Sequence, residues 1–153
     1  MPLIIRSATE AELALLAQMN KKLIEAEGSR NPMSVEELRE RMSYWLGGDW
    51  KVELFAEQDA IVGYAVYQLR QDEYDSNKQV VYLRQFYIEP DKRNQGLGQF
   101  ALEVLVREHF PTGSTIVIDV LASNPAGYRF WSKVGFQPYC TTMHLQNLES
   151  ISA

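Results

Sequence analysis

A glycine-containing turn between a strand-like and a helix-like segment constrains this chain more than any other feature. It reads Arg-Asn-Gln-Gly-Leu-Gly over residues 93–98, between a strand predicted over residues 80–88 and a helix predicted over residues 98–109. Glycine allows a tight turn with bare backbone N–H groups, and the first turn of a helix adds unpaired N–H groups and the positive end of its dipole. The segment therefore predicts an anion site, most often for a phosphate or pyrophosphate.

Length and composition predict one soluble domain over residues 1–153. The net charge is −5, so a nucleic-acid partner, which needs a basic face, is not expected. No segment approaches the ~18 apolar residues of a membrane helix, and the N-terminal residues lack the pattern of a secretion signal. The single cysteine, Cys140, fits a reducing compartment, and His109 and His144 stand alone without metal-ligand spacing. We therefore expect a cytoplasmic protein without a membrane partner or a metal.

The pattern of elements predicts a mixed α/β, or α+β, domain. Capping boxes at Thr9 with Glu12 and at Ser34 with Glu37 begin two N-terminal helices. Asn124 before a proline begins the last helix as an N-cap. Strictly alternating strand–helix repeats are absent, which argues against a doubly wound fold. Strands are predicted from the apolar pattern over residues 3–6, 52–56, 61–69, 80–88, 115–121 and 136–145.

The glycine pattern also matches a dinucleotide-binding Rossmann unit. Gly96-x-Gly98-x-x-Ala101 has the required spacing, and Asp119 lies about twenty residues downstream. However, seven residues separate the predicted strand from Gly96, and Asp119 lies inside the next predicted strand instead of closing it. Almost one hundred residues also precede the motif, which usually opens such a domain. An NAD-binding oxidoreductase is therefore the least favoured alternative.

A second motif gives the loop a more specific meaning. Arg93-x-x-Gly96-x-Gly98 resembles the acyl-coenzyme A site of the GNAT superfamily of N-acetyltransferases, and residues 124–136, from Asn124 to Phe136, resemble a second block of that family. The resemblance extends over residues 3–145. It implies a twisted central sheet, mixed but mostly antiparallel, of about six to seven strands flanked by about four helices. It also implies transfer of an acetyl group from acetyl-CoA to a primary amine by direct attack.

The resemblance implies a set of coenzyme contacts. Backbone N–H groups of the loop would hold the pyrophosphate, with help from the Arg93 side chain. Backbone groups at the end of the preceding strand would pair with the pantetheine arm, and the Asn124 side chain would reach that arm unless it serves as a helix cap. The implied residues are Phe86, Tyr87, Ile88, Arg93, Asn94, Gln95, Gly96, Leu97, Gly98, Gln99, Asn124 and Trp131.

Acetyl transfer to an amine is helped by a general base for the amine and a general acid for the leaving thiolate. An amine with a pKa near ~10.4 is about 0.1% neutral at pH 7, so a base helps the attack. Asp119 is the best candidate, because burial in its predicted strand would favour proton uptake near neutral pH; the alternative is a carboxylate that hydrogen-bonds a neighbouring loop. Glu53 and Tyr82 are weaker candidates. Many members use a tyrosine as the acid where this chain has Trp131, and the substitutes nearby in the sequence are Tyr128 and Tyr139.

The acceptor site is less defined. Glu25 and Glu27, after the first helix, could attract a cationic amine. Arg84 and Gln85 interrupt an apolar strand and are expected on opposite faces, so that at least one could line the acceptor pocket. Dimers are common in the family that this chain resembles, so a homodimer is one assembly to test. A catalytically idle module that binds acyl-CoA for a sensory or regulatory role is the first alternative to an enzyme, since Trp131 departs from the family pattern.

Overall fold

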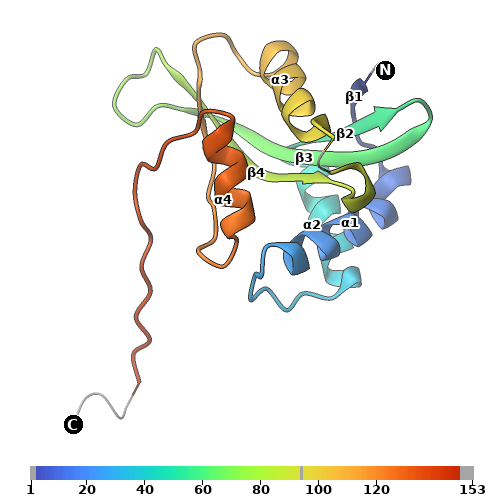
Figure 1. Ribbon diagram of the computed structural model, residues 1–153, viewed down its shortest axis with the longest axis horizontal. Helices are drawn as coiled ribbons and strands as arrows, with labels where there is room; N and C mark the ends of the chain where they lie inside the picture. The colour runs from blue at the N-terminus through green and yellow to red at the C-terminus, as the bar shows by residue number, and fades with distance from the viewer. Residues whose placement is uncertain (1–2, 94, 149–153) are drawn as a thin grey trace.

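Five strands form one sheet with helices on both faces (Figure 1). The computed structural model describes residues 3–93 and 95–148. The strands follow the chain order β1-β2-β3-β4-β5 across the sheet; the first four are antiparallel, and β5 is parallel to β4. The strands are β1 (Leu3–Ser7), β2 (Lys51–Glu57), β3 (Ala60–Gln71), β4 (Gln79–Ile88) and β5 (Thr115–Val117). The helices are α1 (Leu13–Ala26), α2 (Val35–Leu46), α3 (Leu97–His109) and α4 (Pro125–Lys133), with short 3-10 turns at η1 (Glu10–Glu12) and η2 (Pro90–Lys92).

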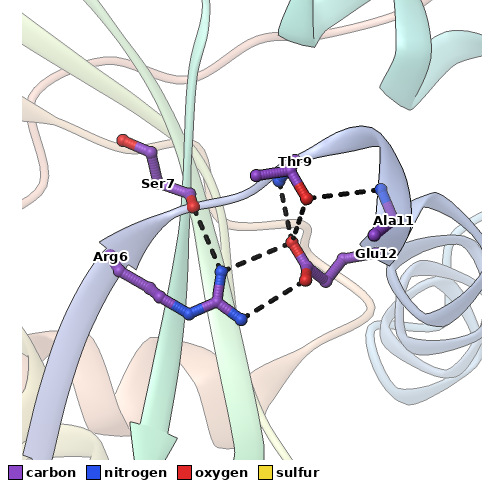
Figure 2. A network of polar contacts seen from close by, with 5 residues as sticks. All are labelled: Arg6, Ser7, Thr9, Ala11 and Glu12. Atoms are coloured by element: carbon purple, nitrogen blue, oxygen red, sulfur yellow. Dashed lines mark hydrogen bonds and ion pairs between the residues drawn. The ribbon is translucent and has the colours of Figure 1, made fainter.

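Both predicted capping boxes are confirmed. Figure 2 shows the first, in which the Thr9 N–H donates to Glu12 Oε1 at 2.8 Å and Arg6 forms an ion pair with Glu12 at 3.3 Å. The Thr9 backbone N–H, followed by the Arg6 guanidinium, holds the pKa of Glu12 below its usual range. In the second box, the Ser34 N–H donates to Glu37 Oε1 at 2.9 Å and the Glu37 N–H donates to Ser34 Oγ at 3.2 Å. The first box caps η1, which leads directly into α1, and the second caps α2.

Alternation along the strands produces two apolar cores. Leu54 and Tyr64 face α1 and α2, whereas Phe55 and Ala65, their neighbours in sequence, face α3. Figure 1 shows α1 and α2 on one side of the sheet and α3 on the other. The mixed α+β class, the mostly antiparallel sheet and the four helices are confirmed, while the sheet has five described strands instead of six to seven. In the described part of the chain, no helix is long and apolar enough to cross a membrane.

The strand predicted over residues 115–121 is shorter than expected. Three residue pairs join it to β4, from Val80↔Thr115 to Tyr82↔Val117, and residues 118–121 are not in a strand. The chain diverges there toward the connection between α1 and α2, where Ser123 Oγ donates to the Glu27 carbonyl at 2.8 Å. As a result, β4 continues to Ile88 without a described strand beside residues 83–88 on the β5 side.

The strand predicted over residues 136–145 is wrong for the described chain. Residues 137–148, which we call the C-terminal arm, run away from the domain in an extended path (Figure 1). Large apolar side chains on the arm are almost fully exposed, with Tyr139 at 93%, Met143 at 86% and Leu145 at 90%. The arm has the period-two pattern of a strand, but a strand also needs a neighbouring edge, and the arm reaches none in its own chain.

Candidate active site

The segment predicted to bind an anion forms the turn at the start of α3. Gly96 is the N-cap, in the left-handed region at φ 78°, and no side chain caps the helix. Within residues 3–93 and 95–148, the first N–H groups of α3, those of Leu97, Gly98 and Gln99, therefore have no intrahelical or side-chain acceptor. A Cβ on Gly96 would meet nothing within 4 Å, so the turn faces open space. Gln95 uses its side chain to donate to the Asp91 carbonyl at 3.2 Å, and Asn94 lies outside the described residues.

The turn lies against the end of β4 and against α4. A Cβ on Gly98 would lie 3.3 Å from Phe130 Cε1 and 3.8 Å from Ile88 Cγ1, so the first turn of α3 approaches both elements closely. Arg93 Nε donates to the Ile88 carbonyl at 2.8 Å, and its guanidinium lies 5.4 Å from the centre of the Tyr87 ring. Arg93 thus fastens the turn to the strand, a structural role beside the predicted contact with phosphate.

Trp131 packs in an aromatic cluster. Its ring centre lies 5.4 Å from Phe86, 4.9 Å from Phe130 and 5.3 Å from Phe136, each in an edge-to-face arrangement. The indole therefore packs α4 against Phe86 of β4 and against Phe136, which lies beyond the end of α4. This packing explains how a tryptophan is accommodated at the position where the related family often has a tyrosine.

Two further predicted residues lie on or next to α4. The side-chain oxygen of Asn124, Oδ1, accepts from the Gly127 N–H at 3.0 Å, so the helix-cap alternative is confirmed for that atom, and the side-chain nitrogen Nδ2 remains as a donor. Tyr128 is half exposed. Tyr139, the other substitute acid, lies on the C-terminal arm outside the domain.

Asp119 pairs with Tyr82 but is not buried. It follows the end of β5 and is exposed, so the expectation of a buried strand residue is wrong. The Tyr82 hydroxyl donates to Asp119 Oδ2 at 2.6 Å. Burial of the phenol, and then its bond to Asp119, raises the pKa of Tyr82 to about 12. At neutral pH Tyr82 therefore keeps its proton and orients the carboxylate, which argues against Tyr82 as a base.

Glu53 lies in a different place. Its buried carboxylate accepts from the Tyr67 hydroxyl at 3.2 Å and lies 3.8 Å from His109 Nδ1, near the last turn of α3. The anion site is at the first turn of the same 13-residue helix, and an α-helix rises about 1.5 Å per residue, so the two lie roughly 20 Å apart. The geometry does not bring Glu53 to the predicted anion site.

A β-bulge overturns the prediction that Arg84 and Gln85 face opposite sides. β3 pairs Val66 with Gln85 and Tyr67 with Leu83, which leaves Arg84 as an extra residue on β4. Leu83 and Phe86 consequently both lie on the α3 side. Arg84 and Gln85 both point to the other side, where Arg84 lies over a tryptophan of α2 and Gln85 accepts from the Tyr64 hydroxyl at 2.8 Å.

Sequence reasoning did not identify the group of side chains around Arg84. Its guanidinium lies 5.2 Å from the Trp45 ring and 5.7 Å from the Trp50 ring. Trp50 lies 6.0 Å from Tyr82, which connects this group to Asp119. Two more guanidiniums join it: Arg41 at 4.5 Å from Trp45 and Arg70 at 4.5 Å from Tyr82. We call these residues, Arg41, Trp45, Trp50, Arg70, Tyr82 and Arg84, the arginine–aromatic cluster.

Glu27 lies on the same side of the sheet. It is the C-cap of α1, and burial raises the pKa of its carboxyl group. Its charge also contributes to the raised pKa of the fully buried Tyr64 phenol, after burial itself. Glu25, by contrast, is exposed on the last turn of α1. Of the two glutamates singled out in the sequence, Glu27 is the one placed near the sheet.

The fold and the site together define a class of protein. A mixed sheet with helices on both faces places the start of α3 against the end of β4 and against α4. The profile of the acetyltransferase (GNAT) family matches residues 17–136, more than half of the chain. The chain belongs to the GNAT family of acetyltransferases, which confirms the resemblance and replaces the dinucleotide-binding alternative.

Solved structures of acetyltransferases have the same fold. A possible acetyltransferase from Clostridium difficile 630 has a TM-score of 0.78 at 15% identity, covering 97% of this chain and 99% of the other. A predicted acetyltransferase from Clostridium acetobutylicum, solved with acetyl-CoA, has a TM-score of 0.72 at 20% identity, covering 95% and 96%. An aminoglycoside N-acetyltransferase in complex with CoA has a TM-score of 0.73 at 15% identity, covering 95% of each chain. The sequence matches no curated protein at a significant level.

Proposed function

We propose that this protein transfers an acetyl group from acetyl-CoA to a primary amine by direct attack, without a covalent enzyme intermediate. The observation that carries the proposal is the start of α3, where Gly96 faces open space and no described side chain caps the N–H groups that follow it. Backbone donors at the positive end of a helix suit a pyrophosphate. Two related folds solved with acetyl-CoA or CoA support this choice of donor.

The residues beside the turn fit the rest of the coenzyme. β4 has no described strand next to residues 83–88 on the β5 side, so backbone groups of Phe86 and Tyr87 are available to an amide-rich arm. The Asn124 amide nitrogen supplies a donor near the start of α4. When bound, the thioester supplies the acetyl group and a thiolate leaving group.

We assign the proton transfers to two residues of this chain. Asp119 takes a proton from the acceptor ammonium, and Tyr82, donating to Oδ2 at 2.6 Å, holds the carboxylate in place. The amine nitrogen then forms a bond to the acetyl carbon while the carbon–sulfur bond breaks. Tyr128 is the proposed donor of a proton to the leaving sulfur, and its phenolate then takes the second proton from the nitrogen of the new amide. A thiol with a pKa near ~8.5 also leaves as an anion, so loss of Tyr128 would slow the transfer less than loss of the base.

Binding and turnover test this proposal together. We expect heat release when acetyl-CoA or coenzyme A is titrated into the protein, none with NADH, and thiol release from acetyl-CoA with at least one member of a broad amine panel. Failure to bind acetyl-CoA would contradict the proposal. Binding without thiol release for any amine would instead favour the catalytically idle acyl-CoA-binding module.

A further inference from the structure

We propose that Arg41 and Arg84 form a subsite for a carboxylate of the acceptor, so that the preferred acceptors are small amines that carry a carboxylate, as amino acids do. This proposal rests on the proposed function and specifies its substrate class. The two guanidiniums lie over the same ring of Trp45, at 4.5 Å and 5.2 Å from its centre. Two cations held on one indole ring form a concentrated positive site.

Neither arginine is neutralised within the described residues. The ion pairs found among residues 3–93 and 95–148 involve other side chains, and no carboxylate lies within 4.0 Å of the Arg41 or Arg84 nitrogens. Burial, and then the charge of Arg84, lowers the pKa of Arg41. An anion bound between the two guanidiniums would remove this repulsion.

The structure holds Arg41 in place while leaving one of its donors unused. Arg41 Nη2 donates at 3.2 Å to Oδ1 of Asn20, whose side chain is fully buried. Arg41 Nε is buried without a hydrogen-bond partner, and so is Asn20 Nδ2. A buried donor without an acceptor is unfavourable, and an anion near the guanidinium would offset part of that cost through its charge. Arg41 is therefore positioned before any ligand binds, and its Nε has no acceptor among the described residues.

The subsite lies next to the proposed base. Arg84 is the bulged residue of β4, and its charge acts on the phenol of Tyr82, which is bonded to Asp119. The Arg70 guanidinium also lies over the Tyr82 ring, 4.5 Å from its centre. An amine at Asp119 and a carboxylate at Arg84 can therefore belong to one small molecule. The same positive charges disfavour polycationic acceptors, against the expectation that Glu25 and Glu27 attract a cation.

Matched ligands test the subsite. Amino acids and their amides are titrated into the protein saturated with coenzyme A, and their KM values are measured with acetyl-CoA. We expect the acids to bind about tenfold or more tightly than the amides, because each lost charge-assisted hydrogen bond costs about 1.5–3 kcal/mol. The Arg84→Gln variant should lose this preference and keep its affinity for acetyl-CoA. Arg39→Gln, at an exposed arginine of the same helix as Arg41, is the control and should retain the preference.

If the unmodified protein binds amino acids and their amides with equal affinity, the proposed subsite is wrong. It is also wrong if Arg84→Gln weakens the binding of the acid and of the amide by the same factor. Both outcomes can be read from binding alone. They therefore differ from a failure of the proposed function, which would appear as absence of thiol release.

Discussion

Replacing Gly96 by alanine is expected to weaken the binding of acetyl-CoA by about tenfold or more while the protein stays folded. Gly96 has φ 78°, a region in which a residue with a Cβ costs roughly 1–2 kcal/mol. The new methyl group would project into the open space in front of the first N–H groups of α3, where the proposed pyrophosphate lies. Titration calorimetry measures the affinity, and thermal unfolding reports the structural cost.

Gly113 provides a matched control for this prediction. It has φ 83° and also meets nothing within 4 Å, but it lies after the other end of α3. Gly113→Ala should therefore lower stability by a similar amount and leave acetyl-CoA affinity unchanged. If Gly96→Ala and Gly113→Ala bind acetyl-CoA with equal affinity, the Gly96 turn is not the pyrophosphate site. Any change in affinity would then be explained by the backbone strain that the two variants share.

Local signals in the sequence predicted the elements on which the site is built. The capping boxes at Thr9 and Ser34, the glycine turn and the Asn124 cap are each defined by residues three or four apart, and all four are present. Short-range hydrogen bonds of this kind depend little on the rest of the fold. The donor side of the site was therefore accessible from sequence.

The acceptor side depends on tertiary structure, and it was predicted less well. The bulge at Arg84 is a property of pairing with β3, and a single extra residue reverses which face the following side chains reach. The arginine–aromatic cluster contains residues from α2, β3 and β4 together with Trp50. Because these residues are far apart in the sequence, no short sequence motif predicts the cluster. The signal that could have suggested it was the pair of tryptophans on either side of the second helix's end, together with an arginine in an apolar strand.

The predictions for two of the strands were wrong for a related reason. Period two over residues 115–121 and 136–145 is typical of half-buried strands, but a strand forms only beside a partner edge. β5 leaves its partner after Val117, and the C-terminal arm has no partner edge in its own chain. Asp119 is thereby moved from the expected strand interior to an exposed position, where Tyr82 holds it.

The Asp119→Asn variant should reduce kcat/KM about 100-fold, because general-base catalysis contributes roughly 10²–10⁴-fold. The asparagine amide cannot take the proton from the ammonium, but it retains the shape of the side chain and its contact with Tyr82. Affinity for acetyl-CoA should not change, because Asp119 lies outside the α3 turn. Asp59→Asn, an exposed aspartate on the turn between β2 and β3, controls for the change in net charge and should keep full activity.

Tyr82→Phe distinguishes the role of a positioning residue from that of the base. The hydroxyl donates to Asp119 Oδ2 at 2.6 Å and so fixes the direction of the carboxylate. Without it the carboxylate is still present but less well oriented, so kcat should fall by roughly tenfold or less, a smaller loss than in Asp119→Asn, and the affinity for acetyl-CoA should not change. If Asp119→Asn instead keeps the pH–rate profile of the unmodified protein, Asp119 is not the base. Glu27, whose pKa is raised by burial on the same side of the sheet, then becomes the carboxylate that accepts the proton.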